Sequence, residues 1–189
     1  YGSQPRQFTA LKSGMILFRT EGGSFYFTRG TPETTLVHAF SQYPCLNFQC
    51  EEFEPLLPIS EGALWLSPTT ATLRYTDGRS GTEGVRTIMT NMWPHTLSRY
   101  PVTKRMLTTF GQNGALFFSV ESNPDGTYSR KLWRTDVSSG ETTLVKSIPL
   151  PVPSLNGVYP QGIEAVVTHQ KLVFFMGNDS QHGNELWRT

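Results

Sequence analysis

Residues 132–135 read Leu-Trp-Arg-Thr, and the same four residues return unchanged at positions 186–189, which is 54 residues further along the chain. A second match keeps this period. Thr-Thr-Leu-Val occupies positions 34–37 and again positions 142–145, a separation of 108 residues or twice 54. Two matches on one period, in a consistent order within the unit, indicate an internally repeated structure.

Extension of the pattern gives four copies of a unit built around a short apolar segment. These segments are residues 16–18, 64–66, 116–118 and 173–175, with Leu17, Trp65, Phe117 and Phe174 as their middle residues. A strand is predicted before each segment (7–12, 57–60, 103–109 and 163–168), and another after it (25–28, 73–76, 132–135 and 186–189). In the first three units a further strand follows a Gly-containing turn (34–39, 85–89 and 142–148). Short runs rich in Val, Thr, Phe, Tyr and Trp, separated by turn residues, are strand signals.

Units of four strands and about 50 residues are typical of the blades of a β-propeller. We therefore predict an all-β fold, a β-propeller-like array of about four four-stranded antiparallel blades. It forms one domain over residues 1–189, with approximate units 5–48, 55–90, 102–148 and 161–189. The last unit stops before its outermost strand. Residues 1–13 are one source for that strand, but they already form the inner strand of the first unit. We therefore favour completion by a neighbouring subunit or by the rest of a longer parent chain.

Composition narrows the class of protein. The chain has 189 residues, 16 Lys and Arg against 15 Asp and Glu, and a net charge of +1, which disfavours nucleic acid and anionic membranes as partners. No apolar run reaches the roughly 20 residues of a membrane-spanning helix, so we expect no membrane insertion. The chain opens at Tyr1 rather than Met, which we interpret as processing or excision from a longer protein.

Cys45 and Cys50 are the only two cysteines, and a bond between them would close a small loop. A local disulfide is the preferred interpretation and would place the protein in an oxidising compartment. The alternative is a pair of free, partly buried thiols.

The last two units resemble a known bacterial repeat. Residues 184–189 read Asn-Glu-Leu-Trp-Arg-Thr, and residues 132–136 read Leu-Trp-Arg-Thr-Asp, followed by Gly140 and by Thr-Leu-Val-Lys-Ser-Ile at 143–148. This pattern is similar to the "ELW-x-(T/S)-DGT-xx-GT-x-LVKDI" tandem repeats of large secreted and surface proteins. The resemblance covers residues 116–189 well and is faint in the first two units. It implies a propeller-like array in an extracellular or cell-surface setting, and it names no common activity.

The connections between units are the predicted binding sites, because loops on a rigid scaffold commonly carry function. Trp93, His95 and Tyr100 lie in the connection at residues 90–102, and Tyr159 lies in the connection at residues 149–161. These four residues are the candidate ligand contacts. Together with the connection at residues 41–55, the loops would form one face of the array if the repeat is regular.

Other motifs have both a structural and a functional interpretation. Trp133 and Trp187 occupy equivalent positions, where they are either packing residues between blades, which we favour, or sugar-stacking platforms. Residues 123–126 and 178–180 are rich in Asn and Asp, which suits turns better than calcium sites. Asn178 also begins a glycosylation sequon, which we regard as incidental.

We predict a binding or interaction module, active in protein–protein contact or adhesion, and no enzyme. A carbohydrate-binding lectin is the alternative. A propeller-fold carbohydrate-active enzyme, with carboxylates such as Glu61 and Glu164 converging on the axis, ranks third. Motifs for nucleophilic, metal-dependent or phosphate chemistry are missing from the sequence, so we predict no catalytic residue, no metal ligand and no cofactor.

Overall fold

All secondary-structure elements that the computed structural model describes are β-strands, and they form four antiparallel sheets. The described residues are 5–11, 13–20, 25–31, 36–38, 56–60, 62–67, 71–78, 84–92, 107–150, 166–169, 172–179 and 183–188. Within these ranges the all-β prediction is confirmed.

Each sheet is built from strands that follow one another in the chain. Sheet A contains β1 (Pro5–Ala10), β2 (Ile16–Thr20), β3 (Phe25–Thr28) and β4 (Leu36–His38). Sheet B contains β5 (Leu57–Ile59), β6 (Gly62–Ser67), β7 (Thr72–Thr76) and β8 (Val85–Met89). Sheet C contains β9 (Leu107–Phe110), β10 (Gly114–Ser122), β11 (Tyr128–Asp136) and β12 (Thr142–Leu150). Sheet D contains β13 (Val166–His169), β14 (Leu172–Asp179) and β15 (Gly183–Arg188).

The strand register shows which residues of the four sheets are equivalent. Phe117 pairs with Trp133 across β10 and β11, and Phe175 pairs with Trp187 across β14 and β15. In the same place Phe18 pairs with Tyr26 in sheet A, and Trp65 pairs with Arg74 in sheet B. Phe18, Trp65, Phe117 and Phe175 are therefore equivalent, one aromatic residue per sheet.

This equivalence corrects the sequence alignment in the first and last units. Leu17 and Phe174 were predicted to match Trp65 and Phe117, but each lies one residue out of register. Since neighbouring residues of a strand point to opposite faces, the correction moves both side chains to the other face of their sheets. The error arose because three consecutive apolar residues give no alternation by which to fix the register.

Threonine and glycine shape the turn between the third and fourth strands. The hydroxyl oxygen of Thr28 accepts a hydrogen bond from the backbone N–H of Gly30 at 2.9 Å, and Thr76 does the same for Gly78 at 3.2 Å. Both glycines have positive φ, 99° and 81°, which L-residues with a side chain rarely adopt. In sheet C, Thr135 instead donates to the Glu141 carbonyl at 3.2 Å.

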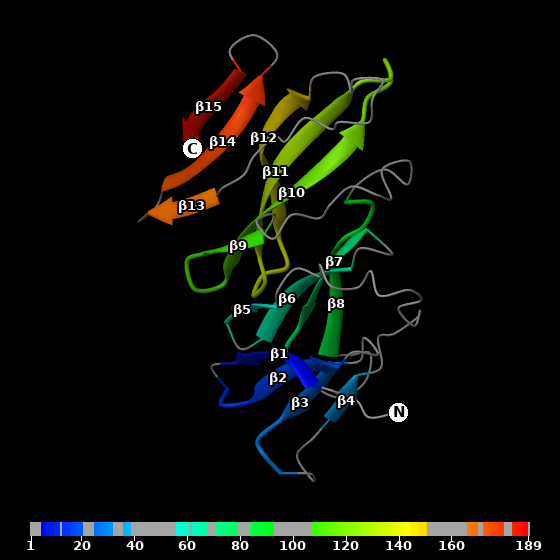
Figure 1. Ribbon diagram of the computed structural model, residues 1–189, viewed down its shortest axis with the longest axis vertical. Helices are drawn as coiled ribbons and strands as arrows, with labels where there is room; N and C mark the ends of the chain where they lie inside the picture. The colour runs from blue at the N-terminus through cyan, green and yellow to red at the C-terminus, as the bar shows by residue number, and fades with distance from the viewer. Residues whose placement is uncertain are drawn as a thin grey trace.

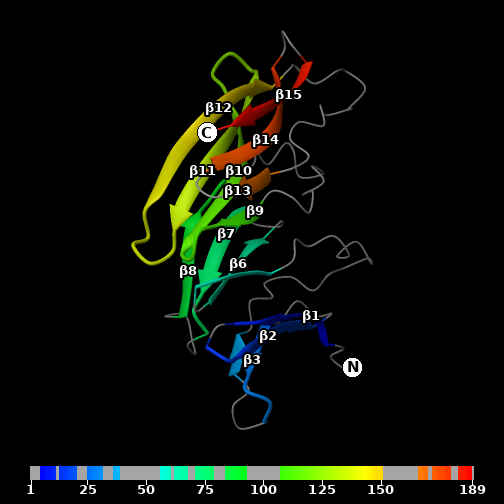
Figure 2. The ribbon, with the colours of Figure 1, turned by 90° about the vertical axis from the view of Figure 1, so that its left-hand side faces the viewer.

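The sheets lie one after another in a row (Figures 1 and 2), from sheet A at one end of the molecule to sheet D at the other. The first strands form a line through the row, because β1 lies next to β5, β5 next to β9, and β9 next to β13. Each sheet thus has an N-side face toward the preceding sheet and a C-side face toward the following one.

The core lies between successive sheets. One apolar cluster joins sheets A and B, with Leu17 and Phe27 of sheet A against Ala63 and Trp65 of sheet B. A larger cluster joins sheets B, C and D, and its fully buried members include Leu64, Leu73, Phe117, Phe118, Leu132 and Phe175. A single twisted sheet cannot bury its own apolar faces, so each sheet buries them by packing against the neighbouring sheets.

Candidate interaction surfaces

The predicted loop residues lie outside the described part of the chain. This applies to Trp93, His95, Tyr100 and Tyr159, to Cys45 and Cys50, and to Glu61 and Glu164. Their roles as ligand contacts, disulfide partners and paired carboxylates stay predictions.

Met92, the last described residue before Trp93, is hydrogen-bonded on both sides. Met92 is fully buried, and its backbone N–H donates to the carbonyl of Ala71 at 2.8 Å. Its own carbonyl accepts from the N–H of Val120 at 2.7 Å. Met92 thereby ties sheet B to sheet C.

The turn between β10 and β11 lies at the end of β10 that Met92 contacts. Asn123 donates through Nδ2 to the hydroxyl of Thr127 at 2.9 Å and accepts from Ser129 at 3.2 Å. Oδ1 of Asp125 accepts the hydroxyl of Thr127 at 2.6 Å and its backbone N–H at 2.9 Å. Both bonds lower the pKa of Asp125, and the bond from the Thr127 hydroxyl has the larger effect. Residues 123–127 form a hydrogen-bonded turn whose Asn and Asp oxygens serve the turn itself.

The opposite rim contains a second aspartate turn and a link between sheets B and C. Oδ1 of Asp136 accepts the hydroxyl of Ser138 at 2.5 Å and the backbone N–H groups of Ser138 and Ser139 at 2.8 and 3.2 Å. The Ser138 hydroxyl is the main cause of the lowered pKa of Asp136. Next to this turn, the guanidinium of Arg86 in β8 donates to the carbonyl of Val137, which joins sheet B to sheet C. The turn is therefore held by hydrogen bonds among its own residues and by the bond from Arg86 of sheet B.

The two repeated tryptophans are packing residues. Trp133 is half-buried, packs against the larger apolar cluster, and donates through Nε1 to the hydroxyl of Ser119 at 2.8 Å. Trp187 packs against the same cluster and stacks on Phe175, with ring centroids 6.4 Å apart. The ammonium of Lys146 in sheet C lies 5.2 Å from the centre of the Trp187 ring. The contacts of both indoles with the apolar cluster, and the contacts of Phe175 and Lys146 with the Trp187 ring, support the packing interpretation over sugar stacking.

The N-side face of sheet A carries an exposed aromatic ladder that sequence reasoning missed. Phe8 stacks on Phe18 with centroids 5.5 Å apart, and Phe18 stacks on Tyr26 at 5.2 Å with an interplanar angle of 8°. Phe8 is 63% exposed, and Ile16 on the same face is 39% exposed. None of the four belongs to either apolar cluster of the described residues.

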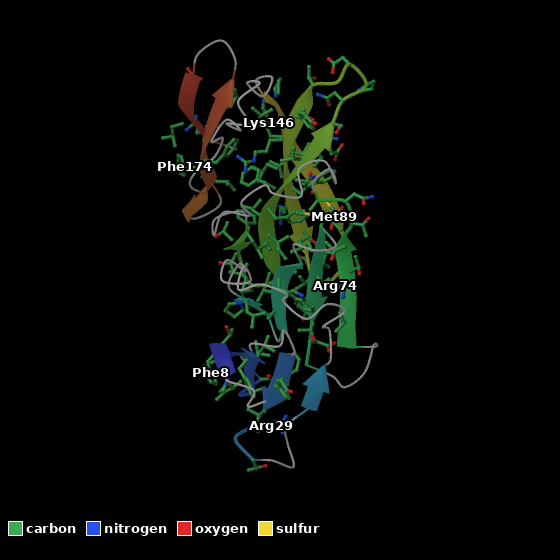
Figure 3. All side chains as sticks on the ribbon, turned by 45° about the vertical axis from the view of Figure 1, so that its right-hand side comes forward. Phe8, Arg29, Arg74, Met89, Lys146 and Phe174 are labelled. Carbon is green, nitrogen blue, oxygen red and sulfur yellow. The ribbon has the colours of Figure 1, made fainter. Side chains whose placement is uncertain are left out.

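The C-side face of sheet D is exposed in the same way. Leu186 is 72% exposed and Leu172 is 39% exposed, and Phe174 on this face is half-buried. Figure 3 shows Phe8 in the lower part and Phe174 in the upper part of the molecule. Among the described residues there are five exposed large apolar side chains, and four of them lie on these two terminal faces. The signal in the sequence was that Phe18 and Leu186 keep the apolar character of their buried equivalents, Phe117 and Leu132.

Comparison of the chain with models of known protein families and with curated proteins finds no match. The described ranges contain no group of three or more His, Cys, Asp or Glu side chains arranged to hold a metal ion. They also contain no helix with the length and apolarity of a membrane span.

Proposed function

We propose that the protein is an extracellular or cell-surface interaction module that binds other proteins through the ends and loops of a repeat array. The observation that carries this proposal is the gathering of exposed apolar side chains on two faces, Phe8 and Ile16 on sheet A, and Leu172 and Leu186 on sheet D. Exposed apolar side chains that gather on one face are a mark of interaction sites in soluble proteins. The similarity of residues 116–189 to repeats of secreted and surface proteins supports the proposed location.

We further propose that the array is propeller-like, with the four sheets as blades. Three features support it: strands that follow chain order within each sheet, first strands aligned in a row, and an apolar core between successive sheets. In a propeller the connections from one blade to the next leave the same rim. The loops that hold Trp93, His95, Tyr100 and Tyr159 would then form one binding face, with a Cys45–Cys50 disulfide stabilising the first connection.

Binding of the immobilised chain tests this function. Extracellular protein partners should bind saturably, and Trp93→Ala or Phe8→Ser should weaken the binding about tenfold or more if that surface is used. Leu144→Ser is the matched control, because Leu144 is 48% exposed but lies on β12 within the array. A glycan array measured in parallel should show no binding of the chain to any glycan. Saturable glycan binding that Trp93→Ala abolishes would instead identify a lectin, and turnover of a glycan would identify an enzyme.

A further inference from the structure

The fourth strands of sheets A, B and C lie at the edges of their sheets. Among the described residues, β4, β8 and β12 each pair with one strand only. Their lengths differ, since β4 has three residues, β8 has five and β12 has nine. Figure 2 shows β12 along one margin of the molecule, with β11 on its inner side. An edge strand presents unpaired backbone N–H and C=O groups to which another strand can add. Of the three, β12 thus has the longest edge at which such pairing could occur.

A β-bulge interrupts both of the longer edge strands at the same position of the repeat. On β12, Val145 is left out of the ladder, because the residues on either side of it pair with the consecutive residues Leu132 and Trp133 of β11. On β8, Ile88 is left out in the same way, opposite the equivalent residues 73–74 of β7. A bulge breaks the regular ladder and bends its strand, so a straight partner strand fits less well on the outer side.

Two exposed residues add to the effect of the bulge on β12. Pro149 has no backbone N–H and therefore cannot donate to a strand on the outer side. Lys146 is the middle residue of the strand. Antiparallel pairing of β12 with β12 of a second copy over its full length would place the two Lys146 side chains directly opposite each other, and like charges in that position destabilise a sheet. The bulge, Lys146 and Pro149 leave no uninterrupted run longer than Thr142–Leu144, which is as short as the whole of β4.

From these features we infer that β12 is protected against edge-to-edge pairing with a second copy of the chain, and that Lys146, Pro149 and the bulge at Val145 provide the protection. The pairing that they prevent is symmetric, because each copy would contribute the same strand to the contact. Unprotected sheet edges of this length are sites of aggregation. The protection concerns the edge of sheet C and is separate from the loops and terminal faces of the proposed function.

Removal of the two protecting side chains in the full chain tests this inference. Lys146→Gln removes the charge and keeps a long side chain beside the ring of Trp187, whose centre lies 5.2 Å from the ammonium. Pro149→Thr supplies the missing N–H. Light scattering after size exclusion should show that the double variant associates at a protein concentration at least about tenfold lower than the unchanged chain requires. The matched control Ser147→Thr changes an exposed residue of the same strand, keeps both protecting side chains, and should behave as the unchanged chain does.

A third substitution shows whether the association occurs at this edge. Leu144→Lys, added to the double variant, places a charge on the same strand and should return the chain to its unchanged behaviour. Two results would overturn the inference. The first is a double variant that circular dichroism shows to be folded and that associates no more readily than the unchanged chain. The second is an unchanged chain that associates and becomes monomeric with Leu144→Lys alone, because its edge would then be open. If the double variant does not fold, Pro149→Thr alone makes the same comparison, and no gain in association would equally overturn the inference.

Discussion

Leu132 and Leu186 occupy the same place in two copies of the repeat, and they should respond very differently to truncation. Leu132 is fully buried between sheets C and D, and Leu186 is 72% exposed on the outer face of sheet D. The same substitution, Leu to Ala, at both positions removes the same atoms from equivalent register positions. The difference in cost therefore measures the burial supplied by a following sheet.

The expected costs follow from burial. Leu132→Ala should lower the free energy of unfolding by about 2–5 kcal/mol, because it removes buried methyl groups and leaves a cavity against Phe118. Leu186→Ala should change it by about 0.5 kcal/mol or less, as is usual for an exposed side chain. Urea denaturation followed by tryptophan fluorescence and by circular dichroism gives both values, and agreement of the two probes tests the two-state assumption.

The comparison is made at low protein concentration, so that association does not add to the apparent stability of the chain. Equal losses at the two positions would refute the reasoning, because Leu186 would then be buried by some other part of the chain. A loss below about 1 kcal/mol at Leu132 would refute it as well, since the sheet C to sheet D interface would not be packed as described.

Three further substitutions test local chemistry. Nε1 of Trp187 is buried without a hydrogen-bond partner among the described residues. Gly177 stands where Ser119 accepts from Trp133 in sheet C, so Gly177→Ser should stabilise the fold by about 1 kcal/mol more than the control Gly177→Ala. Equal effects of the two substitutions in urea denaturation would argue against this bond. Gly62→Ala should cost about 1–3 kcal/mol, because the new Cβ would lie 1.9 Å from the Thr76 carbonyl oxygen, and an unchanged denaturation midpoint would contradict that contact. Because the pKa of Asp136 is lower in the folded state than in the unfolded chain, its contribution to stability is complete above its unfolded pKa of about 3.9 and is lost as the pH falls through the folded value. Asp136→Asn should therefore reduce the loss of stability between about pH 5 and pH 2, and an identical acid limb in both proteins would contradict this.

The repeat made most of the described strands predictable. Once the Leu-Trp-Arg-Thr match fixed the period, the alternation of apolar runs and turn residues located strands near their observed positions in every unit. A clearer signal of the register is the sequence Gly-Ala-Leu, which begins both β6 at residue 62 and β10 at residue 114. That match would have set the register of sheets B and C directly.

The strand register in the first and last units, and the exposure of individual side chains, could not be predicted from the sequence for physical reasons. The runs at 16–18 and 173–175 are apolar at every position, because both faces of a stacked sheet are buried. Such runs do not show which residue points to which face of the sheet. The exposure of Phe8 and Leu186 depends on the presence of a neighbouring sheet, which is a property of the whole array. The ligand contacts predicted in the loops, Trp93 among them, stay predictions.

The division of the core into two apolar clusters has a consequence for local unfolding of the protein. Sheets B, C and D share one cluster, and the backbone of Met92 also joins sheet B to sheet C, whereas sheet A meets sheet B through a smaller cluster around Leu17 and Phe27. Local opening that detaches sheet A breaks few of the bonds that hold the rest. Amide protons of β2 and β3 should accordingly exchange with solvent sooner than those of β10 and β11. We therefore expect the sheet that carries the aromatic ladder to open before the other sheets do.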